Sequence, residues 1–142
     1  MGTVNLNDIL ITPLARIPTL GGDVLHGMKQ SDEGYAGFGE AYFSWLACGA
    51  VKAWKRHTRM TMNVIVPLGQ VKFVFRLDRS DAFRVEEMGV DRYTRLTVPP
   101  GIWFGFQGLA APHSLVLNIA NIPHDSNEVE RLALSEIQYG WN

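Results

Sequence analysis

The sequence predicts a single all-β domain, and three observations lead to that prediction. Fourteen glycines and seven prolines separate short segments rich in Val, Ile, Phe, Tyr and Trp, which is the pattern of strands joined by turns. The length of 142 residues suits one domain, and residues 1–142 contain no linker or repeat. Hydrophobic residues make up 46% of the chain and charged residues 19%, enough to fill one core.

Short segments with strand composition follow one another along the chain. In order they are residues 8–12, 23–28, 38–45, 50–56, 63–66, 70–77, 93–98, 102–106 and 114–120. The Pro-Leu-Gly run at 67–69 predicts a tight hairpin between two of them. Turn signals at spacings of about 8–12 residues are typical of a sandwich or barrel. A jelly roll is the compact way to protect sheet edges in this length, so we expect that architecture.

The alternation of side chains is clearest in residues 70–77. Every second residue there is apolar, which should place one face of the strand against the core: Val71, Phe73, Phe75 and Leu77. One other segment, residues 127–135, has helical spacing of Val129, Leu132 and Ala133 after a capping Asp125 or Ser126. This is the one segment of the sequence that could form a helix.

Charge and cysteine content exclude several classes of function. Thirteen Lys and Arg against 14 Asp and Glu give a net charge of −1, so no overall field favours nucleic acid or anionic lipid. No apolar run is long enough to span a membrane. The single cysteine, Cys48, cannot form an internal disulfide. We expect a cytoplasmic protein in which a local cluster holds any anion.

The densest polar cluster lies at residues 52–59, where four of the 13 cationic side chains accompany a histidine. As a strand, this segment would place Lys55 and His57 on one face. Lys52, Trp54 and Arg56 would lie on the other, unless a bulge turns one of them. One interpretation is a solvated edge strand whose lysines deter pairing. The other is an anion site in which Lys52, Arg56 and Arg59 hold a phosphate and Trp54 stacks on a sugar or base.

The spacing around this cluster is similar to that of the cupin motifs. Gly49, Lys55 and His57 follow the frame of the first motif, and the run at 99–104 follows the frame of the second. At the positions where cupins carry metal ligands, this chain has Lys55, His57, Met62 and Phe104. A divalent metal needs three or four His, Asp, Glu or Cys donors. We therefore expect a cupin-type jelly-roll barrel without a metal or other cofactor.

A second resemblance covers residues 38–141. The segments 49–55, 98–106 and 137–141, together with the turn that ends at Gly69, resemble the dTDP-4-dehydrorhamnose 3,5-epimerase family and its shorter relatives. The resemblance implies proton abstraction beside the 4-keto group of a nucleotide-linked 6-deoxyhexose. In that family a His base oriented by an Asp works with a cation near the enolate and a Tyr acid. It also implies a homodimer.

Carried over by position, the family residues fall on substituted sites. The cation falls on Lys52, the base on Lys55 and the second-motif histidine on Phe104, while the orienting aspartate falls near Leu134 or Ser135. The resemblance thus implies that the family's own dyad is missing. No tyrosine can be assigned as the acid.

Two residues remain as candidates for proton transfer. Lys55 could act as a base if burial and neighbouring cations lowered its pKa. Histidine is the side chain that can change its charge near neutral pH, and His57 is either the base or a structural histidine. Further candidate substrate contacts are Arg76 and, in the segment where the family holds its nucleotide, Glu40 and Tyr42.

These residues lead to three hypotheses. The first is a metal-independent isomerase, a nucleotide-sugar 3,5-epimerase-like protein with Lys55 or His57 as the base. The second is a non-catalytic cupin that binds a sugar, a nucleotide sugar or another small anion. A third is an enzyme acting on a different carbonyl substrate, such as a ketoisomerase. Exposed strand edges and aromatic residues also favour a symmetric homodimer.

Overall fold

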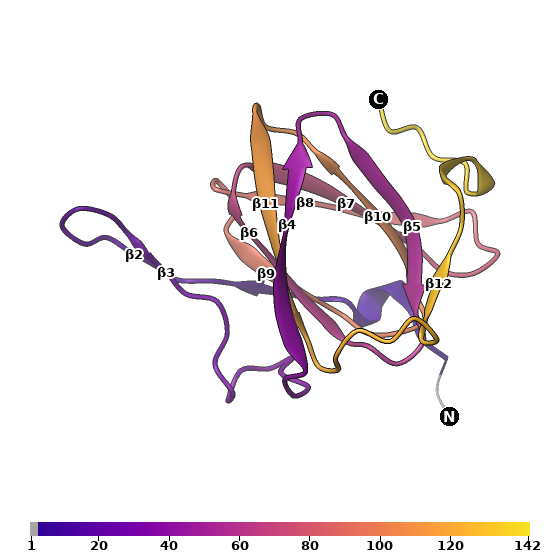
Figure 1. Cartoon of the computed structure of the whole chain (residues 1–142), viewed down its shortest axis with the longest axis horizontal. Coiled ribbons are helices and arrows are strands. Elements are labelled where there is room, and N and C mark those ends of the chain that lie inside the picture. The colour runs from indigo at the N-terminus through magenta and orange to yellow at the C-terminus, as the bar shows by residue number, and fades with distance from the viewer. Residues whose placement is uncertain (1–2) are drawn as a thin grey trace.

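The computed structural model describes residues 3–142 and confirms the all-β prediction. Two five-stranded sheets face each other, and a two-stranded arm projects from one side (Figure 1). The first sheet has the order β1 (Leu10–Pro13), β9 (Thr94–Val98), β6 (Met62–Leu68), β11 (His113–Ala120) and β4 (Glu40–Ala47). The second has the order β12 (Val129–Arg131), β5 (Val51–His57), β10 (Trp103–Gly108), β7 (Gln70–Arg76) and β8 (Phe83–Gly89).

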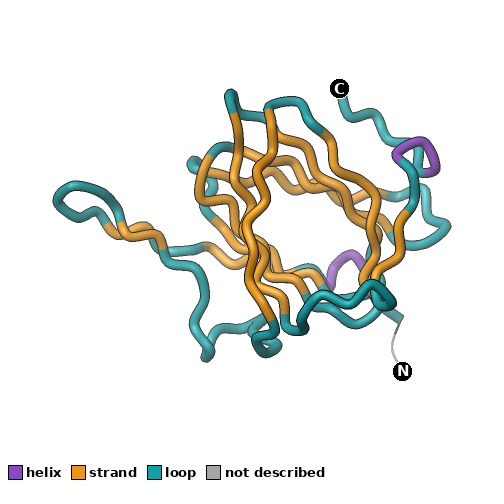
Figure 2. Tube along the Cα trace, in the orientation of Figure 1, coloured by secondary structure: helices purple, strands orange, loops and turns teal. Residues whose placement is uncertain are grey.

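Strands form the wall of the barrel, and loops join them around its rim (Figure 2). The arm consists of β2 (Arg16–Ile17) and β3 (Val24–Leu25) with the loop between them. Two short 3₁₀ helices, η1 (Leu6–Asp8) and η2 (Leu134–Glu136), complete the elements. No helix within residues 3–142 is long and apolar enough to cross a membrane.

The main core lies between the two sheets and confirms the predicted face of residues 70–77. Val71, Phe73 and Phe75 are buried in it, and Leu77 packs against it. Phe104 and Leu96 enter the same core from β10 and β9. Burial of these apolar side chains is the main force that holds the sheets together.

Two sequence predictions about local structure were wrong. Residues 127–135 do not form one helix: 129–131 pair with β5, with Val129 opposite His57, and only 134–136 form a 3₁₀ turn. The segment is too short to be a stable helix alone, and the free edge of β5 offers it hydrogen bonds. The Pro-Leu-Gly turn at 67–69 does not join a hairpin: β6 and β7 belong to different sheets, and Gly69, with a φ of 86°, turns the chain from one sheet to the other.

Strand β8 was not predicted from the sequence. Its charged residues, among them Arg84, Glu86 and Glu87, hide the alternation. The strand nevertheless pairs with the whole of β7, from Gln70 opposite Gly89 to Arg76 opposite Phe83. Backbone pairing at a sheet edge tolerates such polar residues, since one face meets solvent.

A second apolar cluster lies on the outer face of the second sheet. Trp54, Val74 and Trp103 are buried there beneath the C-terminal segment, which contributes Ile137. Tyr139 and Trp141 pack against the same cluster. A Cβ added at Gly105 would lie 2.5 Å from the Ala53 Cβ and 3.2 Å from the Trp141 ring, so only glycine admits this close packing. The C-terminal segment therefore covers this sheet face.

A β-bulge in β5 decides which side chains face the interior. Lys55 pairs with Phe104 and Lys52 pairs with Phe106, while Trp54 has no partner on β10. Residues paired across a sheet share a face, and both phenylalanines point inward. The bulge therefore brings Lys52 to the same face as Lys55 and His57, and leaves Trp54 on the outer face.

Candidate active site

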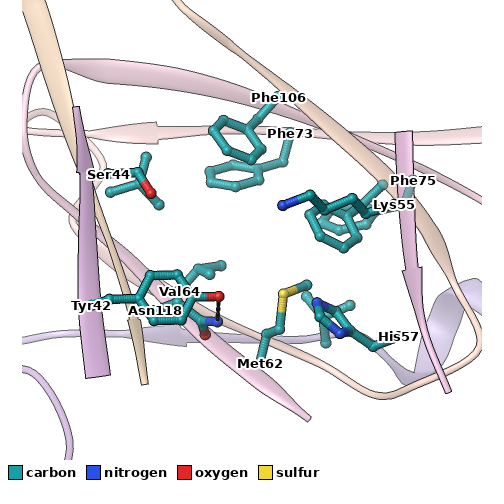
Figure 3. A pocket seen from close by; sticks show the side chains of 13 residues that line it. Tyr42, Ser44, Lys55, His57, Met62, Val64, Phe73, Phe75, Phe106 and Asn118 are labelled. Carbon is teal, nitrogen blue, oxygen red and sulfur yellow. Dashed lines mark hydrogen bonds between the residues drawn. The ribbon is translucent and has the colours of Figure 1, made fainter. Parts of the chain in front are cut away.

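A cavity opens between the two sheets, at the end of the barrel where β5 ends and β4 begins. Its space, including the mouth that meets solvent, amounts to about 530 Å³. Most of the wall is apolar and comes from Met62, Val64, Phe73, Phe75, Val98, Phe104, Phe106 and Val116. The polar lining is restricted to Tyr42, Ser44, Lys55, His57 and Asn118 (Figure 3). Such a site, apolar with a few convergent polar groups, is typical of small-molecule binding.

His57 forms a buried dyad with Glu128. The His57 Nδ1 and Glu128 Oε1 atoms are 2.5 Å apart, and Glu128 is only 2% exposed. The other carboxylate oxygen accepts hydrogen bonds from the backbone N–H groups of Arg59 and Met60, each at 3.1 Å. On its cavity side the His57 ring stacks against Phe104, with 5.8 Å between ring centroids.

The electrostatics of the dyad fix the proton on one nitrogen of His57. Burial alone would raise the pKa of Glu128, but the hydrogen bonds from His57, Arg59 and Met60 outweigh it and hold that pKa below its ordinary value. The carboxylate is therefore ionised near neutral pH, and His57 Nδ1–H donates to it. This leaves Nε2 of His57 as the nitrogen free to accept a proton from a ligand.

Glu128 was not identified from the sequence. The resemblance placed the orienting carboxylate near Leu134 or Ser135, whereas Glu128 comes just before β12. The pairing of Val129 with His57 positions it, together with the hydrogen bond from the Thr58 N–H to the Glu128 carbonyl at 2.8 Å. Recognition of a strand at residues 129–131 would have been the sequence signal that places Glu128 beside β5.

Three cationic side chains surround the mouth of the cavity. Lys52, Lys55 and Arg131 line the same opening beside Phe104 and Phe106. None of the ion pairs within residues 3–142 involves any of these three. Burial lowers the pKa of Lys55, and the neighbouring charges of Arg131 and Lys52 lower it further. The mouth therefore holds uncompensated positive charge, which suits an anion.

Arg131 was missed by the sequence reasoning because its segment was predicted to be helical. In the structure it pairs with Lys55 across β12 and β5. Its side chain consequently lies on the cavity side of the sheet.

Four of the residues predicted to bind substrate lie away from the cavity or only at its edge. Arg56 is on the outer face, where it pairs with Glu130 at 2.9 Å and lies over the Trp103 ring. Arg59 pairs with Asp125 at 2.7 Å beside a separate surface hollow.

The other two are Arg76 and Trp54. Arg76 alternates with Phe75 and so faces outward from β7. Trp54 is buried under the C-terminal segment, where its Nε1 donates to the Leu134 carbonyl at 3.4 Å, and it reaches only the edge of the opening beside Lys52.

Glu40 and Tyr42 lie at the other side of the mouth, on β4. Tyr42 lines the cavity, and its hydroxyl oxygen accepts a hydrogen bond from Asn118 Nδ2 at 2.9 Å (Figure 3). Glu40 lines an adjoining opening together with His124. Lys55 and Arg131 line both this opening and the one beside Lys52, while His57 lines only the opening that contains Glu40.

The donor set of the cavity does not suit a metal ion. Within the described part of the chain, residues 3–142, no group of three or more His, Cys, Asp or Glu side chains could hold one. Among the described residues that line the cavity, His57 is the single donor of this kind, and its Nδ1 is already bonded to Glu128. The remaining lining side chains are a lysine, a tyrosine, a serine, an asparagine and apolar groups.

The chain as a whole is similar to several solved structures. A dTDP sugar isomerase from Desulfovibrio desulfuricans G20 is 34% identical, with a TM-score of 0.88 over 94% of this chain and 90% of that chain. A dTDP-4-dehydrorhamnose 3,5-epimerase from Bacillus anthracis, solved with TDP and pyrophosphate, is 18% identical, with a TM-score of 0.80 over 98% and 87%.

A sugar 3,4-ketoisomerase from Thermoanaerobacterium thermosaccharolyticum, solved with TDP, is 14% identical, with a TM-score of 0.77 over 94% and 96% of the two chains. No protein-family model and no curated protein sequence matches the chain. The two more distant structures establish the fold, and the first, at 34% identity over nearly the whole chain, establishes the family. The chain belongs to the cupin-fold family of dTDP-sugar isomerases and dTDP-4-dehydrorhamnose 3,5-epimerases.

Proposed function

We propose that this protein is an isomerase that removes a proton beside the carbonyl group of a dTDP-linked 4-keto-6-deoxyhexose. The observation that carries the proposal is the buried dyad of His57 and Glu128 at the wall of an otherwise apolar cavity. A histidine held in one tautomer by a carboxylate is suited to act as a general base. The family relationship supplies the class of substrate.

In the proposed reaction, His57 Nε2 accepts a proton from the carbon next to the ketone. The electrons of that C–H bond form a C=C bond, and the carbonyl oxygen becomes an enolate oxygen. The Lys55 ammonium, which also lines the cavity, stabilises the negative charge on that oxygen. A proton then returns to the same carbon and the ketone re-forms. Glu128 stays ionised and stabilises the imidazolium.

The diphosphate of the nucleotide belongs, in this proposal, beside Lys52 and Arg131. Both are free of ion pairs within residues 3–142 and border the opening next to Lys55. Glu40 lines the adjoining opening, and its carboxylate is far better suited to sugar hydroxyls than to phosphate. The sugar then lies between the two sheets, with the nucleotide directed toward Lys52.

A non-catalytic binding module is the alternative, because the sequence resemblance implies that Lys55 and Phe104 stand at histidine positions of the family. The intact His57–Glu128 pair favours catalysis. Burying a carboxylate costs free energy unless it is hydrogen-bonded, and here its hydrogen bond holds a cavity histidine in the tautomer that a general base requires.

We also propose a homodimer, in which a second copy covers apolar residues that one chain leaves exposed. The arm presents Leu20 and Val24, and β4 presents Phe43 and Trp45, of which Trp45 is 63% exposed. An isolated two-stranded arm is marginally stable in water. Sedimentation equilibrium should give twice the chain mass of 15.9 kDa; a single-chain mass would refute the dimer.

We further propose that the protein acts in the reducing cytoplasm, because its one cysteine, Cys48, is a free thiol.

Deuterium exchange tests the proposed function. The protein is incubated with dTDP-4-keto-6-deoxyglucose in deuterated water, and the sugar is followed by proton NMR. Incorporation of deuterium beside the ketone, above a protein-free control, supports an isomerase. If the protein binds TDP yet leaves the sugar unlabelled, the non-catalytic alternative is correct. Transfer of the ketone to C3 would identify a ketoisomerase.

A further inference from the structure

Among the lysines of residues 3–142, Lys55 is the one that lines the cavity. Figure 3 shows its amine directed toward the middle of that space. The other lysines are engaged elsewhere. Lys52 and Lys72 each donate to a backbone carbonyl, at 3.4 and 3.2 Å, and Lys29 lines a separate hollow at the base of the arm. The amine of Lys55 is therefore the amine that a ligand in the cavity meets.

The surroundings of Lys55 favour its neutral amine over the ammonium. Lys55 takes part in none of the ion pairs among residues 3–142, although Glu40 lines the adjoining opening with it. Burial of part of the side chain lowers its pKa, and the charges of Arg131 and Lys52 lower it further. A lysine beside other cations in an apolar pocket is suited to attack a carbonyl carbon as a nucleophile.

Lys55 and His57 act on the same part of the cavity. They are two positions apart on β5, so their side chains share a face and their Cα atoms lie about 7 Å apart along the strand. Glu128 holds His57 in the tautomer whose Nε2 accepts a proton. A ketone carbon at the Lys55 amine therefore lies near the histidine, which is where the adjacent carbon must be to lose its proton.

The position of Lys55 also lets water leave and return. Its side chain is exposed where the cavity opens to solvent, and it lines both openings of the mouth. Formation of an imine releases one water molecule, and its hydrolysis consumes one. An amine sealed in the core would allow neither step, whereas an amine at the mouth allows both.

We propose that Lys55 forms an imine with the keto group of the sugar, and that His57 removes the proton from the carbon beside the protonated imine. This inference rests on the proposed function. It changes the role of Lys55 from a neighbouring charge to a covalent bond, so that the iminium nitrogen carries the positive charge that stabilises the deprotonated carbon.

The atoms and electrons of this sequence balance without an oxidant or reductant. Lys55 and the ketone give a protonated imine and one water, because the carbonyl oxygen leaves with two hydrogens. His57 Nε2 then takes the proton from the adjacent carbon. The C–H electrons form a C=C bond, and the electrons of the C=N bond move to nitrogen, which gives a neutral enamine. Return of a proton to carbon and addition of water release the sugar and the free amine.

Reductive trapping tests the covalent bond directly. The full-length protein is incubated with dTDP-4-keto-6-deoxyglucose and cyanoborohydride, which reduces a protonated imine in preference to a ketone. The C=N bond becomes a stable C–N bond, and mass spectrometry of the intact protein and of its peptides locates the adduct. We expect a single adduct, at Lys55. Lys29→Met, which alters an exposed lysine away from the cavity, should be labelled like the wild type.

Two substitutions of Lys55 separate a covalent role from an electrostatic one. Lys55→Arg keeps the positive charge, but a guanidinium stays protonated and does not form the imine. Lys55→Met removes the charge as well. We expect no adduct in either variant, and deuterium exchange beside the ketone should fall by on the order of 100-fold in both, the loss typical of one group that stabilises developing charge. TDP binding by Lys55→Arg in calorimetry shows that this variant is folded.

Three results would overturn this inference. They are deuterium exchange by Lys55→Arg at the wild-type rate, a wild-type protein that exchanges deuterium and yields no adduct, and an exchanging wild type whose adduct lies on another lysine. In each of these cases the wild type still removes the proton, so the proposed function survives. Absence of exchange in the wild type would instead refute the proposed function itself, and this inference with it.

Discussion

His57 and Glu128, 71 positions apart in the chain, are joined by a hydrogen bond of 2.5 Å in a buried site. The bond links the end of β5 to the residue that precedes β12, and so depends on the pairing of these two strands. It converts a histidine beside an apolar cavity into an oriented base.

Replacement of Glu128 by Gln should abolish most proton exchange. The amide cannot stabilise the imidazolium and no longer fixes the tautomer, so we expect the exchange rate to fall by on the order of 100-fold or more. The measurement is deuterium incorporation at saturating nucleotide sugar. Glu130→Gln is the matched control: Glu130 is an exposed neighbour that pairs with Arg56 on the outer face. A similar loss in both variants would contradict the assigned role.

Glu128 should also make the fold sensitive to acid. Its folded-state pKa lies below the ordinary value of 4.5, so the carboxylate stabilises the fold above that value. That stabilisation is lost as the pH falls through the lowered folded-state pKa. Urea denaturation at several pH values between neutrality and pH 3 should show the wild type losing more stability than Glu128→Gln. Parallel losses in the two proteins would disprove this linkage.

The cations at the mouth should dominate TDP affinity. Removing one charge-assisted hydrogen bond costs about 1.5–3 kcal/mol, or roughly 10- to 100-fold in the dissociation constant. We therefore expect Lys52→Ala and Arg131→Ala to weaken TDP binding by that factor in titration calorimetry. Arg56→Ala and Arg79→Ala, which alter an outer-face cation and an exposed turn residue, serve as controls. Equal weakening by all four variants would place the nucleotide elsewhere.

TDP binding should weaken at alkaline pH. Burial and the charges of Arg131 and Lys52 lower the pKa of Lys55 in the free protein. A bound diphosphate favours the ammonium and raises that pKa again. Binding therefore takes up protons between the two values, and affinity falls as the pH rises through the free-protein pKa. Calorimetry across that pH range should show TDP affinity falling in the wild type and falling less in Lys55→Met. Identical pH profiles of affinity in the two proteins would show that Lys55 does not bind the diphosphate.

Much of the fold could be predicted from the sequence because apolar side chains alternate strictly where a strand has one buried face. Residues 70–77 are the clearest case, and their predicted inner face is buried. The prediction failed where other forces decide. Residues 129–131 become a strand because the edge of β5 is available, and β8 carries too many charges to show a pattern.

The candidate site could be predicted only in part, because some of its residues are brought together by strand pairing between distant segments. His57 and Lys55 were found because their residue types and spacing are local features. The carboxylate partner and Arg131 depend on a strand pairing that brings distant segments together. Lys52 faces inward because of the bulge at Trp54. The position of a bulge could not be predicted from the sequence, so the face on which Lys52 lies could not be predicted either.

The central claim, that His57 is the base, is tested most directly by deuterium incorporation into dTDP-4-keto-6-deoxyglucose by wild type and His57→Asn. His113→Asn, at an exposed histidine, is the control. We predict labelling beside the ketone with wild type and His113→Asn, and almost none with His57→Asn, while TDP still binds to all three. Labelling by His57→Asn at the wild-type rate would contradict the account.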